Sequence, residues 1–502
     1  MSCLMYPQGT IPRPVSVSPQ TAEDLQLHRL AEAMSVSEYY RLTADDLNGL
    51  FTADEAVLRW RQAVLNDMLT VPALEPAMEN LLDSLDGWES RGGSRRGMDS
   101  FAMGFSLEDF GWLDGYLKKI DTAYQAFSRI PAKSAGVKAL TALLDSLRNS
   151  ARYKDAAADF AALCTGFVSP AKMRLGYNLN PEMKPDRFKL LSMEAYTGDK
   201  GEKKKSEQRK MMLTQRAVET DTMLLQRVSA QAAQDINSFV MRETAVLHGL
   251  KKEIMVCLGV RKLVRGWENA GLPFCFPELK PAAEKAFEAE KLFDPLLLLS
   301  EKELVVPNDI SLRPEGEILL LTGANQGGKT VFLLSMGIGQ WLAQLGFPVP
   351  AARAAISPAD GILTVFAPNG QRYGRHGLLS EEAGRISATV NALTDNCMVL
   401  FNEPLTGTGP EETKSISAEV IAVCMAAKAR GVWVTHVHEL VRNRSALERA
   451  VSWGSRLGSL RVVLDAMDGE SRFTYRVERG EPEGKSHADD ALKRGGISFD
   501  TI

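Results

Sequence analysis

The chain has 502 residues, 45% of them apolar and 24% charged, so it is long enough for a packed core and for more than one domain. Its 59 Lys and Arg against 63 Asp and Glu give a net charge of −4, which excludes a globally basic surface and leaves only local patches for nucleic acid. The six cysteines form no CxxC pair, and no segment reaches the roughly 20 apolar residues of a membrane span. We therefore expect a soluble, cytoplasmic protein with reduced thiols, no leader and no membrane partner.

The first part of the chain is predicted to be helical. Residues 1–20 are rich in Pro and Ser and are expected to form a loose, flexible tail. Across residues 21–169 apolar side chains recur at three- and four-residue spacing, most clearly over residues 57–68, where a capping segment precedes the first apolar residue. The glycines of residues 92–97 predict a loop, and residues 110–147 predict a further helical block.

A change of pattern follows in the middle of the chain. Residues 172–195 contain Asn and Pro in positions typical of turns between short strands, and residues 197–205 form a charged, flexible tip. Residues 206–267 contain no proline and few glycines. About sixty residues of helix would extend for roughly 90 Å, so this segment predicts a long lever arm.

The last part of the chain, after Pro273, alternates short apolar runs with helical segments. Apolar runs at 318–321, 398–401 and 432–434 are separated by helices expected to begin at Lys329 and Thr413. This alternation is typical of an α/β domain with a mostly parallel sheet.

The strongest motif is GANQGGKT, which directly follows the first of these strands. Its members are Gly323, Ala324, Asn325, Gln326, Gly327, Gly328, Lys329 and Thr330. The pattern G-x-x-x-x-G-K-[ST] between a strand and a helix predicts a P-loop, in which backbone N–H groups and the helix N-terminus surround phosphate oxygens. Lys329 would reach the β- and γ-phosphates of ATP, and the Thr330 hydroxyl would bind Mg²⁺. The alternative is a chance match in a Gly-rich turn.

A second signal is the segment MVLFNEP at residues 398–404. Four apolar residues followed by Asn402 and Glu403 describe a buried strand that ends at a nucleotide site. Asn402 occupies the position expected to organise Mg²⁺, partly through water, and Glu403 is the candidate general base. A helix cap or an ordinary surface carboxylate is the alternative for Glu403.

A third signal is VTHVHEL at residues 434–440. His436, at the end of a strand, could sense the γ-phosphate through a hydrogen bond. A histidine with only a structural hydrogen bond is the main alternative. His436 and His438 also suggest zinc, but no third His or Cys follows at ligand spacing.

Taken together and in this order, these segments resemble the MutS family of DNA mismatch-repair ATPases. GANQGGKT is similar to the family's GPNMGGK[ST] loop, VTHVHEL to its A-T-H-[YF]-x-E-L segment, and LFNEPLTGTGP to its D-E-x-x-x-G-T strand and loop. VPNDISL at 306–312 and GKSHADDALKRGGIS at 484–498 resemble the flanks of the same domain. Upstream, residues 50–69 and 175–192 resemble the family's helical core and the strand segment beside its lever.

The resemblance implies a fold, a set of ligands and an assembly. The fold would be an α/β P-loop NTPase domain of the ABC type, preceded by an all-α core and lever domain. The ligands would be ATP and Mg²⁺, bound through the eight loop residues, Asn402, Glu403 and His436. Gly374, Arg375, His376 and Gly377, with Glu381, fall where the family has the G-R-S-T-F-x-x-E loop that completes the partner subunit's site, which implies a homodimer.

Three departures from the family pattern bear on function. His376 and Gly377 replace the family's Ser-Thr pair, and Asn402 removes a negative charge beside Mg²⁺, which should weaken metal binding. The helical core is expected from residue 21, so the mismatch-recognition and connector domains have no room. The resemblance therefore does not extend to mismatch recognition.

The remaining nucleic-acid signal is a basic cluster at the expected tip of the lever. Lys203, Lys204 and Lys205, with Arg209 and Lys210, could contact DNA phosphates without sequence preference. Because Glu202 and Glu207 are interleaved, a solvated helix start is the alternative.

The sequence therefore predicts a dimeric ATPase clamp that couples ATP binding and hydrolysis to lever movement on DNA. The expected domains are a tail (1–20), a helical core with lever and reduced clamp (21–270), a linker that begins the ATPase domain (271–300), and the ATPase domain (301–502). The main alternative is an ATP-binding switch or scaffold with slow turnover. A transporter-type ATPase is a third possibility, but the chain lacks an LSGGQ-like helix start.

Overall fold

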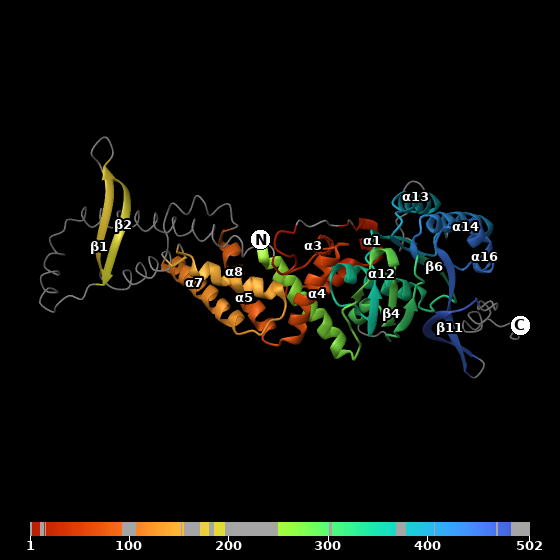
Figure 1. The fold of residues 1–502 in the computed structure, drawn as a ribbon, viewed down its shortest axis with the longest axis horizontal. Coiled ribbons are helices and arrows are strands. Elements are labelled where there is room, and N and C mark those ends of the chain that lie inside the picture. Colours follow the sequence, from red (N-terminus) through yellow and green to blue (C-terminus); the bar gives the residue numbers. More distant parts are fainter. Residues whose placement is uncertain are drawn as a thin grey trace, which may run out of the picture. The chain divides into compact units, whose positions relative to one another are not determined.

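A computed structural model of the chain shows two compact units (Figure 1). The first contains Met1–Leu4 and Asp67–Ile254, and the second contains Met5–Asn66 and Met255–Ile502. The structure describes residues 3–10, 15, 17–92, 107–151, 153–154, 171–179, 185–195, 249–300, 304–367, 378–405, 407–467 and 470–482. Both units therefore contain segments that are far apart in the sequence.

The first unit contains helices that pack against their neighbours in the chain. Its helices are α5 (Leu74–Gly92), α7 (Leu107–Ser128) and α8 (Ala135–Asn149), and α7 packs against both others. Apolar residues at helical spacing are buried on these faces, which is the pattern that predicted the helices. At the start of α8, the Ser134 hydroxyl accepts a hydrogen bond from the Val137 N–H and satisfies a free helix donor.

Two strands also belong to the first unit. β1 (Ala171–Leu179) and β2 (Pro185–Ala195) pair in antiparallel fashion, with Ala171 opposite Ala195 and Leu179 opposite Pro185 (Figure 1). The prediction of short strands around a turn in residues 172–195 is thus confirmed. The same hairpin means that the region before the α/β domain is not purely helical.

The second unit contains a six-stranded sheet with the order β12-β11-β6-β10-β9-β8. All neighbours are parallel except β12, which is antiparallel to β11. The strands are β6 (Glu317–Thr322), β8 (Gly361–Phe366), β9 (Cys397–Asn402), β10 (Arg430–Val434), β11 (Arg456–Met467) and β12 (Glu470–Arg479). The mostly parallel α/β sheet expected from the sequence is confirmed.

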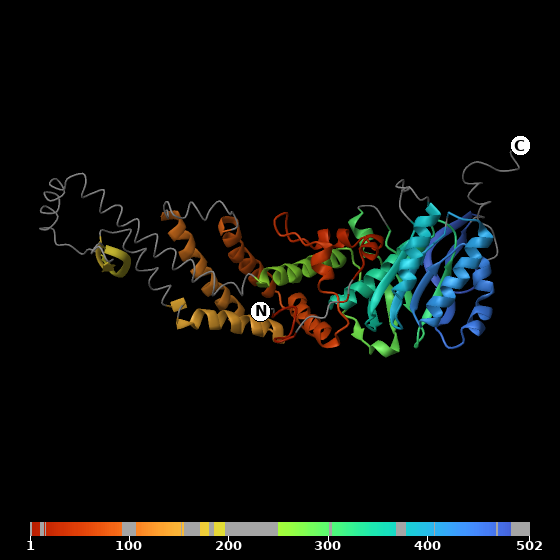
Figure 2. The ribbon, with the colours of Figure 1, turned by 90° about the horizontal axis from the view of Figure 1, so that it is seen from above.

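Helices cover both faces of this sheet (Figure 2). On one face, α12 (Lys329–Leu345) contacts β8, β9 and β10, and it is buried almost all round. The other face packs on α13 (Leu378–Asn391), α14 (Pro410–Ala426), α15 (His438–Arg442) and α16 (Arg444–Ala450). In the core on this face the rings of Phe401 and Trp433 stack with centroids 4.3 Å apart, which ties β9 to β10.

A smaller sheet lies beyond α12. Its order is β3-β7-β4-β5, and β4 also contacts α12. The strands are β3 (Glu278–Leu279), β4 (Phe287–Leu292), β5 (Asn308–Ser311) and β7 (Arg353–Ile356). The chain between β3 and β5 also forms two short 3-10 helices, η2 (Ala282–Glu284) and η3 (Pro295–Leu299). Residues 271–300, expected as a linker that begins the ATPase domain, contain β3, β4 and both 3-10 helices of the second unit.

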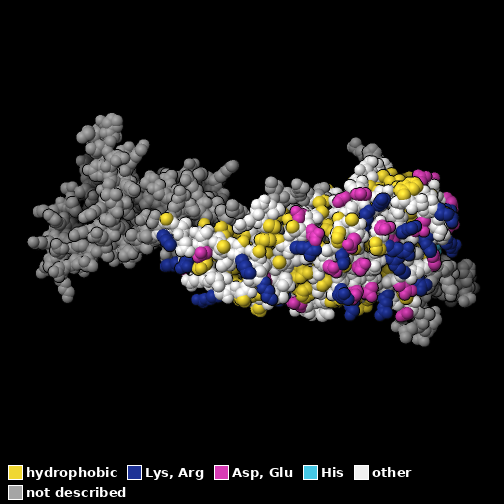
Figure 3. Space-filling model, viewed as in Figure 1, with side chains coloured by type: hydrophobic (Ala, Val, Ile, Leu, Met, Phe, Trp, Pro, Cys, Tyr) yellow, Lys and Arg dark blue, Asp and Glu magenta, His cyan; other side chains and the backbone are white. Residues whose placement is uncertain are grey.

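The visible surface of the described residues carries both signs of charge (Figure 3). Lys and Arg are interspersed with Asp and Glu on the face shown, in keeping with the net charge of −4. No helix among the described residues is both long and apolar enough to cross a bilayer.

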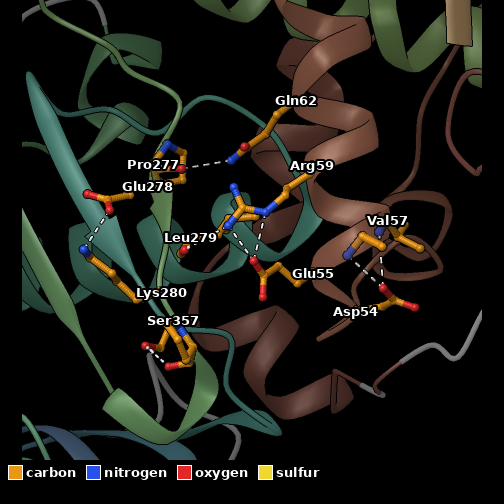
Figure 4. Close-up of polar contacts among 12 residues, drawn as sticks. Asp54, Glu55, Val57, Arg59, Gln62, Pro277, Glu278, Leu279, Lys280 and Ser357 are labelled. Atoms are coloured by element: carbon orange, nitrogen blue, oxygen red, sulfur yellow. Dashed lines mark hydrogen bonds and ion pairs between the residues drawn. The ribbon is translucent and has the colours of Figure 1, made fainter. Parts of the chain in front are cut away.

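The N-terminal segment is an integral part of the second unit. It forms α1 (Pro19–Asp24), α2 (Leu27–Met34), α3 (Ala44–Asn48) and the start of α4 (Glu55–Thr70). Figure 4 shows α4 beside β3, where Gln62 donates to the Pro277 carbonyl over 3.0 Å and Arg59 lies 3.4 Å from that of Leu279. The compact units thus divide the chain differently from the expected boundary near residues 268–300, because residues 5–66 pack on the α/β domain.

Part of the expected loose tail is also buried. Met5 is fully buried, and its carbonyl accepts a hydrogen bond of 2.9 Å from Nε of Arg61, a fully buried arginine on α4. Arg61 also donates to the carbonyl of Leu345 at the end of α12. The Pro and Ser content of residues 1–20 suggested a flexible segment, but apolar residues of this segment such as Met5 are buried in the core.

The described part of the expected lever is helical. Residues 249–269 form a helix, and the rest of the predicted lever, like the charged tip, lies outside the described residues. Gly259 allows this helix to approach α2 closely, since a Cβ there would lie 2.5 Å from the Met34 carbonyl oxygen.

Candidate nucleotide-binding site

The GANQGGKT segment forms the loop between β6 and α12. β6 ends at Thr322 and α12 begins at Lys329, which confirms the predicted strand–loop–helix order. Gly323 has a φ of +151°, and a Cβ at this position would lie only 2.7 Å from the Cβ of Val462 on β11. The close approach of β11 therefore requires glycine at the first position of the loop.

Lys329 places its ammonium group inside this loop. Its Nζ donates to the carbonyl oxygens of Gly323 at 2.9 Å and Ala324 at 3.3 Å, and it lies 3.2 Å from Oε1 of Glu403. The side chain is only 5% exposed, and burial lowers the pKa of Lys329 while Glu403 acts in the opposite direction. The loop thus holds a buried cation whose present partners are neutral carbonyl oxygens and one carboxylate.

Glu403 and His436 meet Lys329 at the carboxyl edge of the sheet. β6, β9 and β10 are parallel neighbours, so the residues that follow them converge at one edge. Oε1 of Glu403 lies 2.8 Å from Nε2 of His436, which is itself 3.5 Å from Nζ of Lys329. The hydrogen bond from His436 and the nearby charge of Lys329 lower the pKa of Glu403 against the effect of burial.

The backbone at Glu403 has an uncommon conformation. Its φ is +50°, in the left-handed region that residues other than Gly rarely adopt. Leu405 also lies in this region, with a φ of +67°. The Glu403 N–H donates to the Val434 carbonyl over 3.1 Å, so the turn is tied to the end of β10. Such strain is concentrated at functional sites, where surrounding contacts hold a side chain in place.

Thr330 and Asn402 provide two oxygen donors beside the loop. Oγ1 of Thr330 lies 3.4 Å from Oδ1 of Asn402 and 3.3 Å from its Nδ2. Hydroxyl and amide oxygens are ligands that Mg²⁺ accepts, and this ion is commonly bound by one or two protein groups together with phosphates and water. The pair therefore fits a Mg²⁺ that takes most of its ligands from a nucleotide.

The zinc alternative for His436 and His438 receives no geometric support. Nε2 of His436 is engaged with Glu403, and no group of three or more His, Cys, Asp or Glu residues that could hold a metal ion is found in the described part of the chain. His436 belongs instead to the cluster formed with Lys329 and Glu403.

Several residues singled out in the sequence lie outside the described residues. They are residues 374–377 of the expected trans loop and the basic residues Lys203, Lys204, Lys205, Arg209 and Lys210. Glu381, which the resemblance places with the trans loop, lies on α13 and is 3.8 Å from Arg385. Arg385 also lies 3.5 Å from Oδ1 of Asp24, so α13 is joined to α1 within the second unit.

The structure adds two residues to the surroundings of the loop. Tyr475 on β12 stands over Gly328, where a Cβ would lie 3.4 Å from Cδ1 of the ring. Asn308 holds this strand by donating to the Tyr475 carbonyl over 3.1 Å and accepting from the Val477 N–H over 2.7 Å. Asn308 belongs to the VPNDISL segment, which resembles a flank of the family's domain but was assigned no function from the sequence. Nothing in the sequence marked Tyr475.

Comparison with known proteins identifies the domain that carries this site. A family model of MutS domain V matches residues 319–489, a range that contains Lys329, Glu403 and His436. Through this domain the chain is similar to the MutS family.

The known proteins to which this chain is similar include mismatch-repair proteins and endonucleases. The DNA mismatch repair protein MutS of Prochlorococcus marinus is 29% identical over 206 residues, which cover 41% of the chain and 22% of the relative. Endonuclease MutS2 of Thermus thermophilus is 30% identical over 212 residues, covering 42% and 26%. Endonuclease MutS2 of Thermomicrobium roseum is 29% identical over 298 residues, covering 58% and 33%. The matches thus span no more than a third of these relatives' length.

Proposed function

We propose that this chain is an ATP-dependent DNA-binding protein of the mismatch-repair type that binds and hydrolyses ATP at the GANQGGKT loop. The observation that carries the proposal is the convergence of Lys329, Glu403 and His436 at the ends of three adjacent parallel strands. A buried ammonium, a carboxylate and an imidazole lie within 3.5 Å of one another, and they offer a phosphate-binding cation, a candidate base and a hydrogen-bond donor for phosphoryl transfer to water.

In this mechanism each residue has a separate task. Lys329 exchanges its bonds to the loop carbonyls and to Glu403 for stronger charge-assisted bonds to the β- and γ-phosphates. Once released, Glu403 accepts a proton from the attacking water as general base. His436 exchanges the contact of its Nε2 with Glu403 for a hydrogen bond to the γ-phosphate, and so senses that phosphate.

The metal site supports the same reaction. A bound Mg²⁺ would supply charge neutralisation between the β- and γ-phosphates. The residues that would hold it are Thr330, through its hydroxyl, and Asn402, partly through water. The Thr330 hydroxyl lies 3.4 Å from the Asn402 amide oxygen, and Glu403 follows Asn402 directly in the chain.

The DNA-binding part of the proposal draws on the named relatives. A homodimer with composite nucleotide sites would place residues 374–377 of one subunit at the partner's nucleotide. Helical levers would then transmit the nucleotide state to basic residues such as Lys203–Lys205. The free energy for this movement comes from the different contacts of the γ-phosphate in the two lever positions.

A switch with slow turnover is the second candidate function. It is favoured by Asn402, which leaves the metal position without a carboxylate, and by Glu403, whose carboxylate is already bound by two partners. Steady-state ATPase rates with and without DNA separate the two candidates. Stimulation by DNA supports the clamp, whereas tight ATP binding with turnover unchanged by DNA supports the switch.

The most informative experiment is a binding panel of duplex, mismatched, branched and single-stranded DNA, and structured RNA. Each is titrated with ATP, with ADP and without nucleotide at one stated salt concentration, because phosphate contacts make affinity salt-dependent. Nucleotide-dependent affinity for any DNA supports the proposal. Absence of nucleotide binding would refute the proposed function, because every later step depends on ATP bound at the loop.

A further inference from the structure

The cation position of the site is lined by neutral groups. Thr330 contributes a hydroxyl and Asn402 an amide, with their polar atoms 3.3–3.4 Å apart. Asn402 is the last residue of β9, so its amide lies at the carboxyl edge of the sheet beside the loop. The amide can accept a hydrogen bond through its oxygen and donate through its nitrogen, which a carboxylate cannot do.

The neighbouring carboxylate is already occupied. Oε1 of Glu403 lies 2.8 Å from His436 and 3.2 Å from Lys329, and the left-handed backbone of Glu403 is fixed by its N–H bond to Val434. Among the described residues no cluster of acidic and imidazole side chains forms a ready-made metal site here. The carboxylate of Glu403 is therefore already paired with the Lys329 ammonium group and in contact with His436 before any nucleotide arrives.

These contacts change the part that the metal plays in binding. Where a second carboxylate stands at the strand end, it repels a bare triphosphate, and a divalent cation must neutralise both. With Asn402 that repulsion is missing, and the amide nitrogen is free to turn towards a phosphate oxygen. Lys329 then supplies the positive charge that the phosphates need.

We infer that this site binds nucleoside triphosphate with little dependence on Mg²⁺, and that Asn402 is the residue that sets this property. The inference rests on the proposed function and concerns the form of its substrate. It applies to affinity, and the rate of hydrolysis is a separate matter.

The test compares nucleotide affinity with and without the metal. A fluorescent ATP analogue is titrated into the full chain in Mg²⁺ and in EDTA at equal ionic strength. The variants are wild type, Asn402→Asp and a control, Asn443→Asp, which adds the same charge at an exposed position between α15 and α16.

The expected result is that only Asn402→Asp makes nucleotide affinity depend on Mg²⁺. Wild type and Asn443→Asp should bind with dissociation constants that differ less than about threefold between Mg²⁺ and EDTA, about 0.7 kcal/mol or less. Asn402→Asp should bind about tenfold more weakly than wild type in EDTA and regain affinity in Mg²⁺, because one unit charge lies close to the phosphates.

Two results would overturn the inference. One is a wild-type affinity that rises tenfold or more with Mg²⁺, a measurement that needs no variant and no assumption about folding. The other is an Asn402→Asp protein, folded by circular dichroism, with the same metal dependence as wild type. If no form of the chain binds nucleotide under either condition, the proposed function itself fails.

Discussion

Replacement of Lys329 tests the assignment on which the proposed function depends. Lys329→Met keeps most of the aliphatic length and removes only the ammonium group. In the structure this group makes bonds of 2.9 and 3.3 Å to the Gly323 and Ala324 carbonyls and a 3.2 Å ion pair with Glu403. The variant therefore removes the buried cation while the loop between β6 and α12 keeps its glycines.

The size of the effect follows from the contacts that Lys329 would exchange. A hydrogen bond to a charged group contributes about 1.5–3 kcal/mol net. Each 1.4 kcal/mol is a factor of ten, so loss of one such bond weakens ATP binding about 10- to 150-fold. Glu403 adds to the loss, because its carboxylate would face the triphosphate without Lys329 between them.

The assay is calorimetric or fluorescence titration of ATP and of ADP. Lys428→Met serves as the matched control, since Lys428 is an exposed lysine of the same unit. We expect the control to bind like wild type and Lys329→Met to lose at least about tenfold in affinity for ATP. A change of less than about threefold in a folded Lys329→Met protein would refute the phosphate-binding role of this lysine.

Three further predictions concern other parts of the chain. Glu403→Gln should retain ATP binding but trap ATP unhydrolysed in single-turnover measurements; normal turnover would remove Glu403 from the mechanism. Burial raises the pKa of Asp24 above its usual 3.8, so its charged form is disfavoured in the folded state. The free energy of unfolding of wild type relative to Asp24→Asn should therefore fall as the pH rises from about 3.8 through the raised pKa, and then level off; urea titrations at several pH values would show this, and a flat difference would contradict it. Neutralising Lys203, Lys204 and Lys205 together should lower DNA affinity equally across sequences and reduce its salt dependence; unchanged affinity would favour a solvated helix start.

Local patterns were sufficient to place the main parts of the candidate site. The strand before the loop, the helix from Lys329 and the strands ending at Asn402 and Val434 all lie where apolar runs and glycines predicted them. The helix expected from Thr413 begins three residues earlier, at Pro410, because proline has the φ angle of a first helical turn. Since parallel strands end at one edge, the meeting of Glu403 and His436 with the loop could also be expected.

Contacts between distant segments could not be predicted from local patterns in the same way. Its Pro and Ser content suggested a loose tail, yet Met5 is buried and bound by Arg61. The strand partners of the small sheet are two to six residues long and come from separate segments, so no periodicity revealed them. Tyr475 reaches Gly328 only because β12 folds back antiparallel to β11.

The sequence by itself determined the chemistry available to this protein: a glycine loop, a lysine, a strand-end amide and acid, and a histidine in the order of the MutS family. Those signals are local, because turns, strands and helix starts depend on neighbouring residues. Only the tertiary structure decided which partners each group has, since burial and pairing depend on residues far apart in the chain. It is this packing that binds Glu403 to Lys329 and His436 and leaves Asn402 and Thr330 as the neutral pair beside them.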